Sequence, residues 1–142
     1  MDIPGSCHCG NIGFSLAWPD EAQIPARSCG CTFCTKHGGV WTSNPRATLR
    51  ARLAEPGSVA RYEFGTATAQ FLVCARCGVA PLVTSRIDGK LYAVVNVNTF
   101  DDFDRSRLRV QPADFEGEDL ASRLDRRRRN WIADVVLPEG GA

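Results

Sequence analysis

Seven cysteines in three tight groups constrain the fold of this chain more than any other feature of its sequence. The groups read C-x-C-G at 7–10, C-x-C-x-x-C at 29–34 and C-x-x-C-G at 74–78. No cysteine is solitary, and an odd number would leave one thiol over in a framework of disulfides. The pattern therefore predicts metal ligands rather than disulfide bonds.

The first and third groups are typical of zinc knuckles. Each is a tight turn that aims two sulfurs at one metal, and the glycine that follows accepts a backbone geometry that bulkier residues resist. Two such turns supply the four thiolates of a closed tetrahedral zinc site, with Zn–S bonds of about 2.3 Å. The expected ligands of this structural zinc are Cys7, Cys9, Cys74 and Cys77.

Spacing alone leaves other interpretations of these two groups open. Cys7 and Cys9 could instead share a metal with two of the middle cysteines, as in a zinc ribbon. A redox-active C-x-x-C pair is the other alternative, but such a pair should lie beside a βαβ pattern. The segments around Cys74 and Cys77 predict strands only.

The middle group places three thiols, those of Cys29, Cys31 and Cys34, in one short loop. Three protein ligands leave one coordination position open, which is typical of catalytic zinc. A thiol substrate suits that position, because zinc deprotonates a coordinating thiol whose free pKa is about 8.5. Alternatively, His37 closes the site as a fourth ligand and leaves no position for chemistry.

The rest of the chain predicts a single, mainly β domain. Its 142 residues suffice for one hydrophobic core and fall short of two domains. Segments rich in Val, Phe, Tyr and Thr predict antiparallel strands, and Asp88-Gly89 between two of them predicts a two-residue hairpin. The expected strands cover 12–16, 47–53, 60–64, 69–73, 82–87 and 91–97.

Within this domain of residues 1–142, a zinc-binding core at 5–104 is expected to precede a charged extension at 105–142. Apolar residues in the extension recur close to one helical face and predict one amphipathic helix running to Pro138. They are Leu120, Leu124, Trp131 and Val135.

The same stretch carries arginines at 123 and 126–129 against Asp125, a local charge of +4. Such a run could bind phosphate, but acidic residues at 114–119 precede it. Acids near the start of a helix and bases further along also suit the helix dipole and the solvent. We therefore expect a solvated face, and rank a nucleic-acid binder last among the functions considered.

Charge and hydropathy also limit the partners. The net charge of +1 provides no overall field that would attract nucleic acid or an anionic membrane. The longest apolar runs, such as YAVVNV, are far too short to cross a bilayer, and the start of the chain lacks the pattern of a signal peptide. A cytoplasmic protein with neither nucleic-acid nor membrane partners is expected.

The three cysteine groups in this order, with Lys36, Gly38-Gly39 and the hairpin after Cys77, resemble the glutathione-dependent formaldehyde-activating enzymes over about residues 5–104. The resemblance implies the Mss4-like antiparallel β fold, built around zinc knuckles. It also implies two zinc ions per chain. Their ligands would be Cys7, Cys9, Cys74 and Cys77 for the structural zinc, and Cys29, Cys31 and Cys34 for the catalytic zinc.

The resemblance further implies a zinc-dependent carbon–sulfur lyase. Its reaction is the reversible condensation of glutathione, or a similar thiol, with formaldehyde to the S-hydroxymethyl adduct, so the partners are a small-molecule thiol and an aldehyde. The alternative is a non-catalytic Mss4-like zinc module that binds another protein. Oligomeric state has no signature in the sequence.

Several polar and charged side chains near the cysteines in sequence could assist this reaction. Polar neighbours of the middle group that could stabilise oxyanion charge are Thr35, Lys36 and His37. Arginines that could bind the carboxylates of glutathione are Arg27, Arg46, Arg76 and Arg86.

Overall fold

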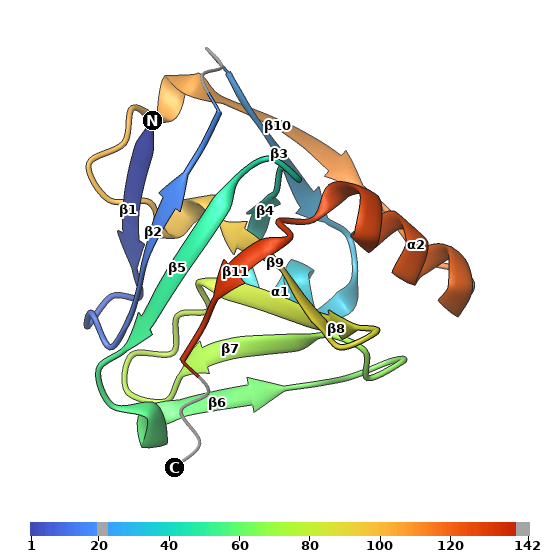
Figure 1. The fold of residues 1–142 in the computed structure, drawn as a ribbon, viewed down its shortest axis with the longest axis horizontal. Coiled ribbons are helices and arrows are strands. Elements are labelled where there is room, and N and C mark those ends of the chain that lie inside the picture. The colour runs from blue at the N-terminus through green and yellow to red at the C-terminus, as the bar shows by residue number, and fades with distance from the viewer. Residues whose placement is uncertain (20–22, 139–142) are drawn as a thin grey trace.

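The computed structural model describes residues 1–19 and 23–138, and its strands form two sheets (Figure 1). The four-stranded sheet has the order β1 (Asp2–Ser6), β2 (Ile12–Ala17), β5 (Thr48–Leu53) and β11 (Asp134–Val136). The seven-stranded sheet has the order β10 (Leu108–Ala113), β3 (Ile24–Cys29), β4 (Val40–Thr42), β9 (Lys90–Asn96), β8 (Leu82–Ile87), β7 (Gln70–Cys74) and β6 (Val59–Tyr62). The mainly β fold class predicted from the sequence is confirmed.

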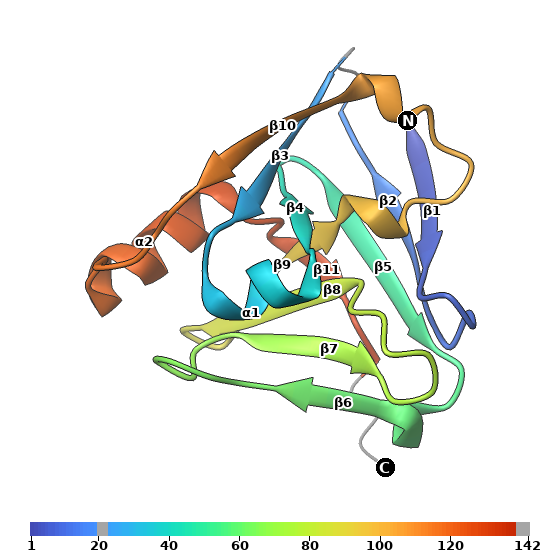
Figure 2. The same cartoon turned by 180° about the vertical axis from the view of Figure 1, so that it is seen from behind.

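Helices are few. The short helix α1 (Thr32–His37) follows β3, and the longer helix α2 (Leu120–Asn130) lies between β10 and β11 (Figure 2). Three single turns of 3₁₀-helix occupy Pro56–Ser58, Val97–Thr99 and Arg105–Arg107.

The main hydrophobic core joins the two sheets. Phe14 and Leu49 of the four-stranded sheet are almost fully buried in the same cluster as Leu72, Leu82 and Val95 of the seven-stranded sheet. Burial of apolar side chains at about 25 cal/mol per Å² is the main force that holds such layers together.

All six predicted strands are present, within two residues at each end. The Asp88-Gly89 hairpin is also confirmed: Ile87 pairs with Lys90, and the loop residues have φ angles of 51° and 79°. Positive φ at both loop residues is the requirement of a type I′ turn.

The predicted extent of the C-terminal helix was wrong. One helix is present, but it ends at Asn130; Trp131 is already extended and Val135 lies in β11. Leu120, at the first turn, is exposed, so the four apolar residues share no single buried face. The helix ends there because the next residues pair with the sheets: Ile132 bridges Ala93.

The extension after Asp104 contributes strands to both sheets. β10 pairs in parallel with β3, from Leu108 opposite Ile24 to Ala113 opposite Cys29. β11 pairs in parallel with β5. Residues 139–142, the end of the predicted extension, lie outside the described residues. Within the described ranges, no helix has the length and apolar character that crossing a membrane requires.

Candidate functional site

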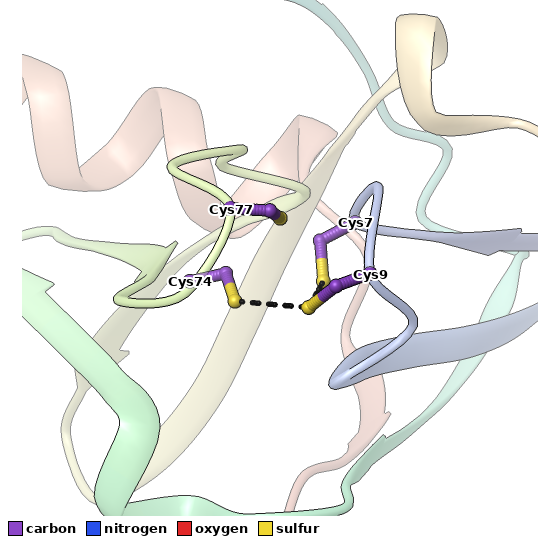
Figure 3. A group of neighbouring side chains, drawn as sticks. All are labelled: Cys7, Cys9, Cys74 and Cys77. Atoms are coloured by element: carbon purple, nitrogen blue, oxygen red, sulfur yellow. Dashed lines mark hydrogen bonds between the residues drawn. The ribbon is translucent and has the colours of Figure 1, made fainter.

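The first and third cysteine groups meet in one cluster of four sulfurs (Figure 3). Cys7 and Cys9 lie in the loop between β1 and β2, whereas Cys74 ends β7 and Cys77 lies in the turn that follows. The four sulfurs all lie within 4.8 Å of one another. The structure thus brings Cys7 and Cys9 to the third group, and not to the middle one.

Sulfur spacing in this four-cysteine cluster suits a tetrahedral metal. Cys9 Sγ lies 3.8 Å from Cys7 Sγ and 3.5 Å from Cys74 Sγ. With Zn–S bonds of about 2.3 Å, two sulfurs of a tetrahedral zinc site lie about 3.8 Å apart. All seven cysteines are free thiols. The donor set therefore fits one zinc ion.

The backbone supports the same cluster. The N–H groups of Ile12 and Arg76 donate to the sulfurs of Cys7 (3.2 Å) and Cys74 (3.4 Å). Burial raises the pKa of Cys7 to about 11. Burial opposes ionisation of Cys74 as well, but hydrogen bonds from the N–H groups of Cys77 and Arg76 lower its pKa to about 6. A bound cation would offset the cost of a buried Cys7 thiolate.

The middle cysteines form a second cluster at the start of α1. Cys29 ends β3, Cys31 caps the helix and Cys34 lies within it, and their sulfurs also lie within 4.8 Å of one another. The N–H of Cys34 donates to Cys31 Sγ at 3.3 Å, so the capping bond of the helix fixes one sulfur. His37 does not join this three-cysteine cluster; its ring stacks on Phe33 with centroids 5.3 Å apart.

Proton sharing makes one of these three sulfurs strongly acidic. The hydrogen bond between Cys34 and Cys29 lowers the pKa of Cys29 to about 5 and, together with burial, raises that of Cys34. The charges of Arg27 and Arg126 interact with Cys29 as well. The cluster thus readily carries a thiolate, the form in which cysteine binds metal.

A cavity of about 450 Å³ opens on the three-cysteine cluster, whose three residues all line it. The seven-stranded sheet supplies an apolar wall from four different strands: Trp41, Phe71, Val83 and Val94. The segment after β10 and helix α2 supply a charged wall that includes Arg123, Arg126 and Arg127. None of the cysteines in the four-cysteine cluster lines this cavity.

The contribution of α2 to the cavity was not predicted from the sequence. A solvated face was predicted for the arginines, yet Arg123 and Arg126 line the cavity and Arg127 is only 7% exposed. Arg128 and Arg129 alone fit that expectation, since both are exposed. The reason is the path of the chain: β10 and β11 tie both ends of α2 to the sheets, which presses one side of the helix against the cavity.

Among the arginines proposed from the sequence, Arg27 lines the cavity. Three others do not: Arg46, Arg76 and Arg86. The polar neighbours Thr35, Lys36 and His37 are likewise absent from its walls.

Comparison with known proteins identifies the family. The sequence profile of the family described as glutathione-dependent formaldehyde-activating enzyme matches residues 2–116, which include all seven cysteines. A crystal structure of a Rhodobacter sphaeroides protein is similar to this one, with a TM-score of 0.61 and 26% sequence identity over 78% of this chain and 99% of that chain. The resemblance predicted from the cysteines is thereby confirmed, and with it the Mss4-like fold. The chain belongs to the glutathione-dependent formaldehyde-activating enzyme family.

Proposed function

We propose that this protein is a zinc-dependent carbon–sulfur lyase that condenses glutathione, or a similar thiol, reversibly with formaldehyde. The observation that carries the proposal is that all three members of the three-cysteine cluster line a cavity, whereas none of the four cysteines in the other cluster lines it. Membership of the formaldehyde-activating family supports the substrates.

The reaction forms one bond between sulfur and carbon. The sulfur of the thiolate attacks the carbonyl carbon of formaldehyde, and the carbonyl oxygen takes up a proton to give the S-hydroxymethyl adduct. In the reverse direction the hydroxyl loses that proton, the C–S bond breaks, and thiolate and aldehyde leave. A catalyst must therefore stabilise the thiolate in both directions.

Two zinc ions per chain are proposed. The four-cysteine cluster would hold one as a structural ion. Cys29, Cys31 and Cys34 would hold the other, which when bound supplies a positive centre that favours the thiolate form of a thiol.

Residues around the three-cysteine cluster also favour the thiolate form of the substrate. Arg27 lines the cavity and its charge interacts with that of Cys29, so it adds positive charge where the substrate thiolate reacts. Trp41 and Phe71 are buried in the wall beside Cys34 and keep water away from the reacting atoms. Electrostatic interactions are stronger in such a partly dry site than in water.

Zinc content and turnover of the parent protein and of Cys31→Ser test the proposal together. We expect two zinc ions per chain in the parent and one in the variant, and loss in the variant of any rate above the spontaneous condensation of glutathione with formaldehyde. A fully active variant would overturn the proposal. One zinc in both proteins would also overturn it, in favour of a zinc-stabilised module that binds another protein.

A further inference from the structure

Helix α2 forms part of the cavity although it lies beyond the family match. The match ends at residue 116, whereas α2 begins at Leu120 and places three arginines on the wall, Arg123, Arg126 and Arg127. This wall therefore belongs to the part of the chain that the family profile does not describe, and it can make this protein differ from its relatives in the ligand it selects.

Four of the five arginines in α2 are paired with carboxylates. Glu118 accepts from Arg126 Nε and Nη2, both at 3.0 Å, and from Arg123 Nε at 3.3 Å. On the outer side of the helix, Arg128 pairs with Asp88 at 3.1 Å and Arg129 with Asp125 at 3.0 Å.

Arg127 is the exception. It is the most buried of these side chains, and its Nη1 donates only to neutral acceptors: Thr68 Oγ1 (2.9 Å), the Thr68 carbonyl (3.3 Å) and Ser85 Oγ (3.1 Å). No carboxylate among the described residues pairs with it. Burial lowers its pKa to about 10, so it keeps its charge at neutral pH. A buried cation without a counter-charge is costly.

One edge of the Arg127 guanidinium is also unused. Its Nε is buried with no hydrogen-bond partner, and its Nη2 makes no hydrogen bond to any described residue. Nε and Nη2 together form an edge that matches the two oxygens of a carboxylate. Arg27, whose hydrogen bond goes to the Ser43 hydroxyl at 3.4 Å, adds a second positive charge to the cavity.

The surroundings of this edge are apolar. The ring of Trp131 lies 5.0 Å from the Arg127 guanidinium carbon, and Trp131 lines the cavity together with Trp41. The indole N–H of Trp131 is buried and has no hydrogen-bond partner. Two acidic residues, Asp114 and Glu116, also line the cavity, and the Asp114 carboxylate accepts the N–H of Glu116 at 2.8 Å. The site offers unused donors and an apolar wall, which suit an acid with an apolar body.

We propose that Arg127 anchors the carboxylate of the substrate, and that the substrate is a thiol acid whose carbon skeleton lies along Trp131 and Phe71. That the substrate reacts through a thiol rests on the function proposed above. That the substrate carries a carboxylate rests only on Arg127 and the unused edge of its guanidinium. Helix α2 is then the element that selects an anionic thiol over a neutral or cationic one.

Binding of benzoate, an acid without a thiol, tests the carboxylate site separately from the chemistry. The zinc-loaded protein is titrated with benzoate and with neutral benzamide, and both are followed by calorimetry and by the fluorescence of the cavity tryptophans. We expect benzoate to bind at least about tenfold more tightly than benzamide. The amide of benzamide cannot accept both charge-assisted hydrogen bonds that a carboxylate accepts, and one such bond is worth about a factor of ten in affinity. Equal affinities would overturn the proposal without any variant.

Benzoate affinity is then compared in two variants, Arg127→Lys as the test and Arg128→Ala as its matched control. Lysine keeps the charge but cannot present a two-donor edge, so benzoate affinity should fall about tenfold or more. Arg128 is the adjacent, outward-facing arginine, and its loss should leave benzoate affinity unchanged. Equal affinity in Arg127→Lys and the parent would overturn the proposal.

Turnover distinguishes this inference from the proposed function. We expect 3-mercaptopropionate to react with formaldehyde faster than 2-mercaptoethanol does in the parent, with the preference lost in Arg127→Lys. Turnover of both thiols at equal rates would overturn the carboxylate anchor and leave the lyase intact. Benzoate binding that depends on Arg127, without turnover of any thiol, would support the anchor and overturn the lyase.

Discussion

The two cysteine clusters use the same ligand type in opposite surroundings. Cys7 and Cys74 are each 1% exposed and belong to the core that joins the two sheets. Cys34 belongs to a separate hydrophobic cluster with Trp41 and Phe71, the residues that wall the cavity. The first set of sulfurs is thus anchored in the core through Cys7 and Cys74, although Cys9 is exposed, and the other set borders a space that a ligand can enter.

The clusters also differ in what they connect. The four-cysteine cluster links the β1–β2 loop of one sheet to the end of β7 in the other, so a metal there closes a long loop between the sheets (Figure 3). The three-cysteine cluster lies within one β3–α1 turn and closes no such loop. Cross-links between distant segments stabilise a fold more than local ones. The comparison supports the structural role proposed for the first cluster and the chemical role proposed for the second.

Cys74→Ser and Cys31→Ser should separate these roles most clearly. Loss of the metal proposed for the four-cysteine cluster should cost up to about 10 kcal/mol of apparent folding free energy, enough to unfold a domain. Cys31→Ser should cost less than about 2 kcal/mol, because serine replaces the sulfur as the helix cap that Cys34 N–H requires. Thermal unfolding of both variants, with zinc content measured on the same samples, checks this expectation. Equal destabilisation would remove the distinction between the clusters.

Glu118→Gln should lower the free energy of unfolding by weakening the contacts of Arg123 and Arg126 in the cavity wall, without changing either cysteine cluster. The hydrogen bond from Arg126 holds the pKa of Glu118 below its ordinary value of 4.5 in the folded protein. This carboxylate therefore stabilises the fold at pH values above about 4.5, and the contribution is lost as pH falls through the lowered folded pKa. At pH 7 we expect a loss of about 1–3 kcal/mol, measured by chemical denaturation.

Asp125→Asn is the matched control, because it removes the exposed pair with Arg129 on the same helix. Such exposed pairs contribute about 0–1 kcal/mol. The difference in unfolding free energy between the two variants should vanish at low pH, where Glu118 is protonated. A difference that persists at pH 2 would show that the wall is held by packing and not by this ion pair.

Sequence patterns predicted those parts of the fold that depend on local signals. Most of the six predicted strands are rich in β-branched and aromatic residues, and the Asp88-Gly89 turn has its own conformational requirement. The missed strands lack such signals. β1 contains Pro4 and Gly5, and β10 contains Pro112 among polar residues. β1 forms because it pairs with the neighbouring strand β2, and β10 because it pairs with β3, which is distant in sequence.

The same distinction applies to the site. The three-cysteine cluster could be predicted because its members lie within six residues, from Cys29 to Cys34. The burial of Arg127 could not, because its acceptors Thr68 and Ser85 come from a loop and a strand far along the chain. Periodicity also predicted a helix that includes Trp131, which was wrong. The helix ends earlier because Ile132 bridges Ala93, a contact that the spacing of apolar residues cannot reveal.

His37→Ala should have the smallest effect and gives the sharpest test of whether the second cluster is open. His37 lies outside the three-cysteine cluster and stacks on Phe33. We therefore expect an unchanged zinc content and a stability change of no more than about 1 kcal/mol, from the lost ring contact. If His37 were a fourth ligand, the variant would instead lose the same zinc ion as Cys31→Ser. Both sites would then have four protein ligands, and the contrast between a site with four ligands and a site with an open coordination position would not hold.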